Sequence, residues 1–326
     1  QDANIRVRMV TGDDVVTGAA VAKQLGIPGE AILGSELAAM SESERLERID
    51  NIGVVGRVAP EHKVLMVETL RKKGDVVAMT GDGVNDAPAI KAADIGIAMG
   101  TGTQVAKNAG RMILTDDNFA TIVRAVSEGR KLYDNMLKYI RFMMVALVTY
   151  VVTFLMASLL NIAGGQPFSA TQILWINFVI TAPVGIALGL DKETPGLMKR
   201  LPRPRSVSIM TPAVLTTVGL VGLFMAVSIN AVIVFGEGRY GQAEVASTMG
   251  LVAFSLMLVV AAFECRDEKA TILQSETFDN RTLNITVLVE LVLAVMIAEG
   301  TLLTSFLRTA DLSGSQWLFG AAPAVV

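Results

Sequence analysis

One short segment, residues 80–86, brings together residue types that handle magnesium and phosphate. Asp82 and Asp86 lie four residues apart across a glycine turn, and Mg²⁺ prefers one or two carboxylates together with phosphate oxygens and water. Glycines on both sides of Asp82 let the backbone approach a ligand closely, and Asn85 supplies an amide for a phosphate oxygen. The segment therefore predicts a site where a magnesium ion meets a phosphoryl group.

A second loop and two cations fit the same chemistry. Thr11 offers a hydroxyl, and Gly12 and Asp13 offer backbone N–H groups before a predicted helix, an arrangement that suits a phosphate. Lys63 follows Arg57 by six residues and could neutralise a phosphoryl group as a point charge. Alone, the loop is ordinary turn chemistry and the cations are ordinary surface residues. Together with the acidic segment they predict phosphoryl transfer, in which catalysis is mostly positioning and charge stabilisation.

The surrounding pattern predicts the elements that would position these groups. Short β-branched runs alternate with helical patterns, which indicates a parallel, doubly wound sheet covered on both faces. In such sheets ligands bind beyond the carboxyl ends of the strands, where both loops stand. His62, the one histidine, is predicted to be a helix-surface residue and not a base. The predicted strands are 5–10, 54–58, 75–79, 95–98 and 112–114, and the helices are 15–25, 61–73, 104–109 and one from residue 87.

Composition divides the chain into two parts. Of its 326 residues 52% are hydrophobic and 18% charged, with 28 basic and 31 acidic side chains and a mean hydropathy of +0.51. These values exclude a disordered protein and a nucleic-acid binder driven by net basic charge, and the single Cys265 excludes an internal disulfide framework. Most charges lie in residues 1–135. The sequence therefore predicts a water-soluble domain over 1–135 and a membrane domain over 136–326.

Apolar stretches in the second part are long enough to span a bilayer, which needs about 20 helical residues. The spans are predicted at 137–160, 170–190, 212–235, 245–263 and 283–307, and a sixth begins near residue 316. Basic residues concentrate in the connections 191–211 and 264–282, so the positive-inside rule assigns these connections to the cytoplasm. We expect residues 1–135 on the same cytoplasmic side, and the plasma membrane as the location.

With these motifs the chain resembles the P-type cation-transporting ATPases, specifically the carboxy-terminal half of a pump of the calcium or sodium–potassium kind. The most specific match is TGDGVNDAPAIKAADIGIAMG at 80–100, and MVTGDD, RVAPEHK, YDNMLKYIRF and LWINF support it. The resemblance implies a Rossmann-like α/β fold of the haloacid-dehalogenase type, serving as a phosphorylation domain, followed by an α-helical transmembrane bundle. It also implies ATP and Mg²⁺ as cofactors, a transported cation such as calcium, and hydrolysis through an aspartyl phosphate.

The resemblance also implies roles for individual residues. Asp82 would hold the catalytic Mg²⁺ with Asp86 beside it, and Lys63 would bind the aspartyl phosphate. Thr11, Gly12 and Asp13 would contact the phosphoryl group or nucleotide, and Arg57 and Asn85 would help to hold them. The family's nucleophile lies in D-K-T-G-T, which this sequence does not contain. We therefore expect a fragment that needs the missing amino-terminal half and that does not turn over ATP by itself.

The predicted ion site departs from the calcium-pump pattern. Positions at which such pumps carry oxygen ligands hold Leu147, Tyr150, Ile180 and Leu258, so a strong calcium site is not expected. The remaining candidates for the transported ion are Asn177 and Thr181, with Thr149, Thr153 and carbonyls near Pro183. Glu290 and Glu299 lie in an apolar span, where an ionisable side chain indicates function by default.

Two other functions stay open at this point. A membrane-anchored phosphatase of the dehalogenase type would need a nucleophilic aspartate within the chain, and Asp13 is the one loose candidate. A non-catalytic truncated remnant would associate only with membranes or with a separate amino-terminal chain. Nothing in the sequence suggests nucleic acid as a partner.

Overall fold

The computed structural model describes residues 3–204, 208–266, 278–300 and 302–325. It divides into two compact units, which are considered separately below. The first consists of Gln1–Arg130 with Pro195–Val207, and the second of Lys131–Thr194 with Ser208–Val326. The domain boundary predicted after residue 135 stays a prediction.

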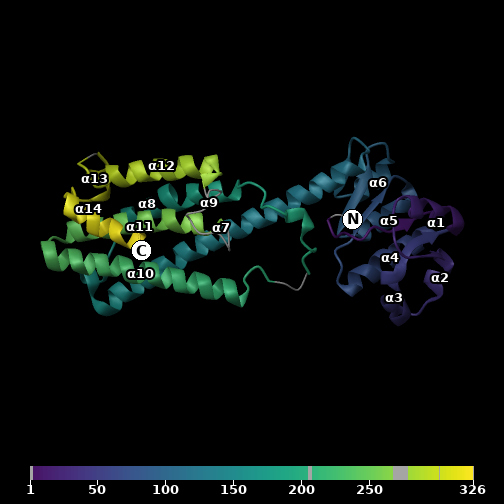
Figure 1. Cartoon of the computed structure of the whole chain (residues 1–326), viewed down its shortest axis with the longest axis horizontal. Helices are drawn as coiled ribbons and strands as arrows, with labels where there is room; N and C mark the ends of the chain where they lie inside the picture. The colour runs from purple at the N-terminus through teal and green to yellow at the C-terminus, as the bar shows by residue number, and fades with distance from the viewer. Residues whose placement is uncertain (1–2, 205–207, 267–277, 301, 326) are drawn as a thin grey trace. The chain divides into compact units, whose positions relative to one another are not determined.

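The first unit contains two parallel three-stranded sheets (Figure 1). One has the strand order β1-β3-β2, and the other has the order β4-β5-β6. In each sheet one edge strand, β1 or β4, leads directly into one of the two loops singled out from the sequence. The strands are β1 (Met9–Val10), β2 (Glu30–Leu33), β3 (Ile52–Gly56), β4 (Ala78–Gly81), β5 (Ile95–Met99) and β6 (Met112–Leu114).

Six helices accompany these strands. The prediction of α6 and β6 is confirmed to the residue, whereas β2, α2 and α3 were not predicted. Strand 5–10 was predicted too long, because only Met9 and Val10 pair with β3. Before them the guanidinium of Arg8 donates hydrogen bonds to the carbonyls of Ile52 and Ile49. Side-chain hydrogen bonds thus replace the backbone hydrogen bonds of a β-ladder at this point. The helices are α1 (Val15–Gln24), α2 (Gly34–Ala39), α3 (Glu42–Arg48), α4 (Pro60–Lys73), α5 (Ala87–Ala92) and α6 (Gln104–Ala109).

A shared apolar core joins the two sheets. Val55 from β3, Leu70 from α4 and Ala89 from α5 belong to one buried cluster, and α4 packs against α5. Burial of these side chains removes apolar surface from water, the main favourable term in folding. The α4–α5 contact therefore fixes the loop after β4 relative to the residues that follow β3.

The second unit is a helical bundle. Among the described residues, four helices are long and apolar enough to cross a membrane: Phe119–Leu160, Ala170–Gly189, Pro212–Tyr240 and Ala243–Glu264. The predicted span at 283–307 corresponds to two shorter helices, with residue 301 between them outside the described residues. In chain order the elements are α7 (Phe119–Leu160), α8 (Ala170–Trp175), the π-helix η4 (Ile176–Thr181), α9 (Ala182–Gly189), α10 (Pro212–Tyr240), α11 (Ala243–Glu264), α12 (Arg281–Met296), α13 (Leu302–Leu307) and α14 (Gly314–Ala321).

A buried polar cluster ties several helix ends of this bundle together. Asp191, just after α9, is 2% exposed and accepts hydrogen bonds from Lys138 on α7 and Arg266 after α11. Asn280, the N-cap of α12, donates to the same carboxylate at 3.0 Å. Because every one of these donors comes from a different element, the Asp191 cluster links α7, α9, α11 and α12.

Candidate functional site

The centre of the candidate site in the first unit is an ion pair. Lys63 Nζ on α4 lies 2.5 Å from Asp86 Oδ1, and the two side chains are 16% and 11% exposed. The other carboxylate oxygen, Oδ2, accepts hydrogen bonds from the backbone N–H groups of Asp82 at 3.2 Å and Gly83 at 3.1 Å. Asp86 is therefore held from both sides, by α4 and by its own loop.

Electrostatics keep this carboxylate charged. Burial alone would raise the pKa of Asp86, but the hydrogen bond and charge of Lys63 and the two backbone N–H groups outweigh it. The pKa of Asp86 consequently lies below its ordinary value. Asp86 and Lys63 therefore place a negative and a positive charge side by side at the loop.

The loop geometry explains the glycine at position 81. A Cβ on Gly81 would lie 2.4 Å from the Asp86 Cβ and 2.6 Å from its carboxyl carbon. Any side chain there would push Asp86 away from Lys63. The sequence requirement thus comes from the close approach of the acidic side chain to the backbone.

Asp82 and Asn85 differ from Asp86 in their exposure. Both are exposed to solvent at the end of β4, and Thr103 N donates to the Asp82 carbonyl at 2.8 Å. The predicted arrangement, with both acids on one cation, stays a prediction: Asp86 is engaged by Lys63, whereas the Asp82 carboxylate is accessible. Across the described part of the chain no group of three or more His, Cys, Asp or Glu residues could hold a metal ion without further ligands.

The loop after β1 meets the residues after β3. Val58 N donates to the Thr11 carbonyl and Arg57 N to the Asp13 carbonyl, which joins the two strand ends. Thr11 Oγ1 accepts from Asp13 N at 3.1 Å and donates to Asp13 Oδ2. The exposed Arg57 pairs with Asp14 at 2.6 Å, and its predicted part in holding nucleotide and phosphate stays a prediction.

The first turn of α4 positions Lys63. Pro60 begins the helix, a position where its missing N–H costs nothing. His62 Nδ1 then accepts a hydrogen bond from Ala59 N at 3.1 Å and so caps the helix. A Cβ on Gly34 would lie 2.4 Å from the same Nδ1, so a glycine makes room for the imidazole. The prediction that His62 is merely a surface residue misses this capping role, because the cap depends on a backbone N–H three residues earlier.

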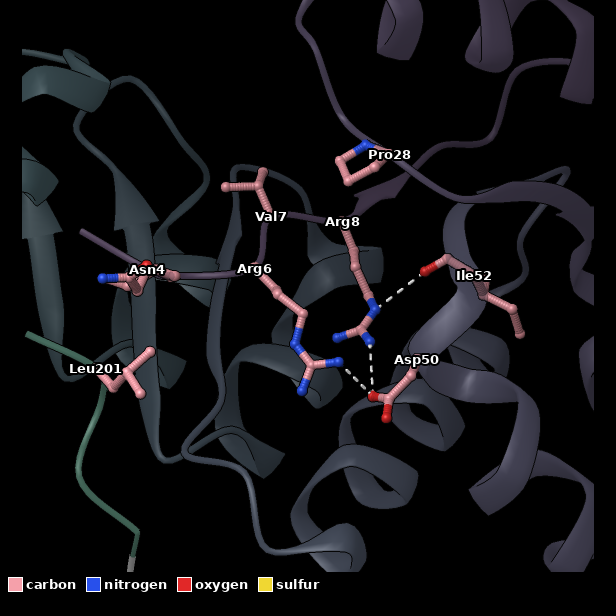
Figure 2. Close-up of a pocket in the computed structure, with 9 residues that line it drawn as sticks. Asn4, Arg6, Val7, Arg8, Pro28, Asp50, Ile52 and Leu201 are labelled. Atoms are coloured by element: carbon pink, nitrogen blue, oxygen red, sulfur yellow. Dashed lines mark hydrogen bonds and ion pairs between the residues drawn. The ribbon is translucent and has the colours of Figure 1, made fainter. Parts of the chain in front are cut away.

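A pocket of about 350 Å³ near the amino-terminal segment was not predicted (Figure 2). Arg6 lies 2.5 Å from Asp50 Oδ1 there, and Arg8 lies 3.6 Å from it. Lys73 binds Asp50 Oδ2 at 2.6 Å, and this bond is the largest cause of a lowered pKa of Asp50. Because Asp50 is shared by three cations of the fold, the cluster is best explained as structural.

The predicted ion ligands in the bundle lie on the π-helix. Thr181 is 1% exposed and donates to the Ile176 carbonyl at 2.8 Å, while Asn177 is exposed and donates to the Ile173 carbonyl at 3.1 Å. Thr149 donates to the Val145 carbonyl of its own helix, the alternative expected for a hydroxyl in an apolar helix. Asn177 and Thr181 therefore lie in the same π-helix, but their side chains bind different carbonyl groups.

The two acids of the last apolar stretch have opposite surroundings. Glu299 is exposed and accepts from Trp317 Nε1 at 2.7 Å. Glu290 on α12 is 4% exposed, and both its carboxylate oxygens lack a hydrogen-bond partner among the described residues. An unpartnered buried carboxylate is costly, so Glu290 needs an explanation.

Comparison with known proteins shows what the two parts of the chain are similar to. Residues 165–326 match the family model for the carboxy terminus of cation-transporting ATPases, and residues 1–94 and 64–126 match models of haloacid dehalogenase-like hydrolases. Calcium-transporting ATPase 1 of Bacillus cereus is 38% identical over 90% of this chain and 35% of its own length. Cation-transporting ATPase pma1 of Synechocystis is 36% identical over 99% of this chain and 37% of its own length. The plasma membrane-type calcium-transporting ATPase 7 of rice (Oryza sativa subsp. japonica) is 37% identical over 97% of this chain and 31% of its own length. The chain spans about a third of the length of these relatives.

Proposed function

Because the chain belongs to the P-type cation-transporting ATPases, we propose that it works as the carboxy-terminal part of an ATP-driven cation pump. It is a multi-pass membrane protein that combines a dehalogenase-like α/β unit with a helical bundle. The observation that carries the proposal is the Lys63–Asp86 pair. It holds the cation Lys63 of α4 beside the acidic loop after β4, and phosphoryl transfer depends mostly on such positioning and on charge stabilisation.

In this function the residues of the first unit act as a phosphate and magnesium site. The accessible carboxylate of Asp82 would hold Mg²⁺, which supplies charge to neutralise phosphate oxygens. Lys63, next to the loop, would stabilise the negative charge of the transferred group. Thr11, Gly12 and Asp13 would bind the phosphoryl group through a hydroxyl and backbone N–H groups, and Arg57 and Asn85 would bind nucleotide after Arg57 leaves Asp14.

We further propose that the nucleophilic aspartate comes from polypeptide outside this sequence. No D-K-T-G-T segment is present in the 326 residues. In the described sheets, β1 and β4 each pair with a single neighbour and end in the two phosphate-type loops. A further strand alongside either edge would bring its carboxyl end next to these loops. The cytoplasmic side is the location proposed for this unit.

The test is phosphoenzyme formation by a chain extended through an upstream D-K-T-G-T segment. We expect Mg²⁺-dependent ATPase activity and an acid-stable, hydroxylamine-sensitive phosphoprotein. Asp82→Ala should abolish both, whereas Glu47→Ala, at an exposed acid of the same unit, should leave both unchanged. Full activity of Asp82→Ala would refute the site. Hydrolysis of a simple phosphate ester by the 326-residue chain alone would favour the phosphatase alternative.

A further inference from the structure

The backbone of Asp82 is held on both sides, although its carboxylate is exposed. Its N–H donates a hydrogen bond to Asp86 Oδ2 at 3.2 Å, and its carbonyl accepts one from the N–H of Thr103 at 2.8 Å. The first bond lies within the loop after β4, whereas the second comes from a separate loop, the one after β5. Groups behind a metal ligand fix its direction, so the second loop bears on the proposed magnesium site.

The loop after β5 turns back at the point where the ladder between β4 and β5 ends. The last pair of this ladder includes Gly81, and β5 itself ends at Met99. Gly102 N then donates to the Met99 carbonyl at 3.1 Å, which closes a turn of four residues. This turn brings the N–H of Thr103 to the Asp82 carbonyl, directly beyond the ladder. The hydrogen bonding between the two strands thus continues into their loops.

The contact between the two loops leaves no room for a side chain at position 102. A Cβ on Gly102 would lie 2.9 Å from the carbonyl oxygen of Asp82 and 3.1 Å from its Cα. It would also lie 3.0 Å from the carbonyl oxygen of Met99. All three are backbone atoms, so they cannot turn aside as the end of a flexible side chain would. A larger residue at position 102 would therefore displace the backbone of Asp82, the turn, or both.

The loop after β5 is itself held on its other side. Gly100 N donates to the carbonyl of Leu114 on β6 at 2.7 Å, and a Cβ on Gly100 would lie 2.6 Å from that oxygen. Thr101 N lies 3.3 Å and 3.2 Å from the two carboxylate oxygens of Asp117, which follows β6. Because β6 and the residues after it fix the loop, the loop can serve as a rigid support for Asp82.

We propose that residues 100–103 form a support that positions Asp82 for Mg²⁺, with Gly102 and Thr103 as the positioning residues. Neither residue would touch the ion. Gly102 allows the close approach of the two loops, and the Thr103 N–H fixes the backbone from which the Asp82 carboxylate projects. A ligand on a fixed backbone loses less conformational freedom when the ion binds. The proposal rests on the proposed function and adds a third loop to its site.

The first experiment measures hydrogen–deuterium exchange of the 326-residue chain in detergent and needs neither ATP nor Mg²⁺. Thr103→Pro removes the N–H, and the φ of −63° at this residue suits proline. Thr103→Ala keeps the N–H but, like the proline variant, lacks the hydroxyl that caps α6, so it is the matched control. We expect the amides of Asp82 and Gly83 to exchange about three- to tenfold faster in Thr103→Pro than in Thr103→Ala, because their loop loses one hydrogen bond. Equal exchange in the two variants would overturn the proposal.

The second experiment measures the Mg²⁺ concentration that half-saturates phosphorylation of the completed pump. Thr103→Pro and Gly102→Ala should raise it about tenfold, the usual effect of losing a group that orients a metal ligand. Thr103→Ala should stay near the parent, and so should Gly129→Ala, at a glycine of α7 with open space around its Cβ position.

The two experiments separate the possible failures. A merely structural loop would lower the amount of phosphoenzyme at saturating Mg²⁺ and leave the half-saturating concentration unchanged, which would overturn the proposal. Absence of phosphoenzyme in the parent would refute the proposed function, whereas the exchange experiment would still show whether the loop after β5 holds Asp82.

Discussion

The two units each bury a carboxylate near a candidate site, and they differ in how its charge is balanced. Asp86 in the first unit accepts hydrogen bonds from Lys63 and from two backbone N–H groups. Glu290 in the second unit has no hydrogen-bond partner among the described residues. In the first unit the chain itself completes the charge pattern, and the ligand is expected beside it, at Asp82. In the bundle no described group completes it. A buried acid thus indicates a binding position when its own fold leaves it unpaired.

The largest effect should follow from removing the compensated acid of the bundle. Asp191→Asn leaves Lys138 and Arg266 buried without a counter-charge, and breaking such a cluster costs about 3 kcal/mol or more. We expect a lower midpoint in chemical denaturation of the detergent-solubilised chain and loss of the link between helix ends. Exposed Asp279→Asn is the matched control and should stay within about 0.5 kcal/mol of the parent. Equal effects of the two variants would contradict the role assigned to the Asp191 cluster.

The next effect concerns Lys63. Lys63→Met leaves Asp86 largely buried without its cation, which should cost about 2 kcal/mol of unfolding free energy after allowance for partial exposure. In the completed pump it should reduce phosphorylation by about 10²–10³-fold. Lys72→Met, at an exposed ion pair on the same helix, is the control and should change little.

The pH dependence of the stability of Lys63→Met tests whether the lost ion pair causes the effect. In the parent the pKa of Asp86 is lowered, so its contribution to stability is complete above the ordinary carboxyl pKa and disappears as the pH falls through the folded value. Without Lys63 the burial of Asp86 should raise its pKa relative to the parent, so the variant should lose less stability on acidification through this group, and the stability difference between parent and variant should shrink as the pH falls. Urea midpoints measured between neutral and acidic pH would show this, and superimposable profiles would refute the electrostatic explanation.

The elements that were predicted correctly from the sequence are those that depend on the local pattern of residue types. The periodicity gave α6, β6 and the long apolar helices, because amphipathic and apolar runs depend on few distant contacts. The acidic loop was found because two acids, an amide and glycines stand close together. Strand 5–10 failed at Arg8, whose guanidinium bonds to distant carbonyls that no local pattern contains.

The sites could be predicted only as far as residue types. The sequence indicated Glu290 and Glu299 equally, since both stand in one apolar stretch. Which acid is unpaired depends on α9 and α11 packing around α12, a tertiary property. Similarly, the π-helix at Ile176–Thr181 changes which residues face inward, and a helical period of 3.6 does not reveal it. Asn177 and Thr181 therefore stay predicted ion ligands, without a contact that joins them.

A smaller effect is expected at His62. His62→Leu removes the acceptor for Ala59 N and should cost about 1 kcal/mol, the usual value of an N-terminal cap. His62→Gln supplies an acceptor at the third helical position and should recover most of that loss. If His62 positions Lys63 through the first turn of α4, the leucine variant should also slow phosphorylation of the completed pump, and the glutamine variant should restore it. Recovery of stability without recovery of rate would show that the cap is only structural.

The smallest effect should come from Glu299. It is exposed, and its hydrogen bond from Trp317 Nε1 competes with water, so Glu299→Gln should change the unfolding free energy by no more than about 0.5 kcal/mol. Glu290→Gln replaces a buried carboxylate that has no partner among the described residues, and it should leave stability unchanged or raise it, because a neutral amide is cheaper to bury than a carboxylate. Midpoints of chemical denaturation of the two variants would check this, and a large loss of stability in Glu290→Gln would mean that this carboxylate has a stabilising partner in the folded chain.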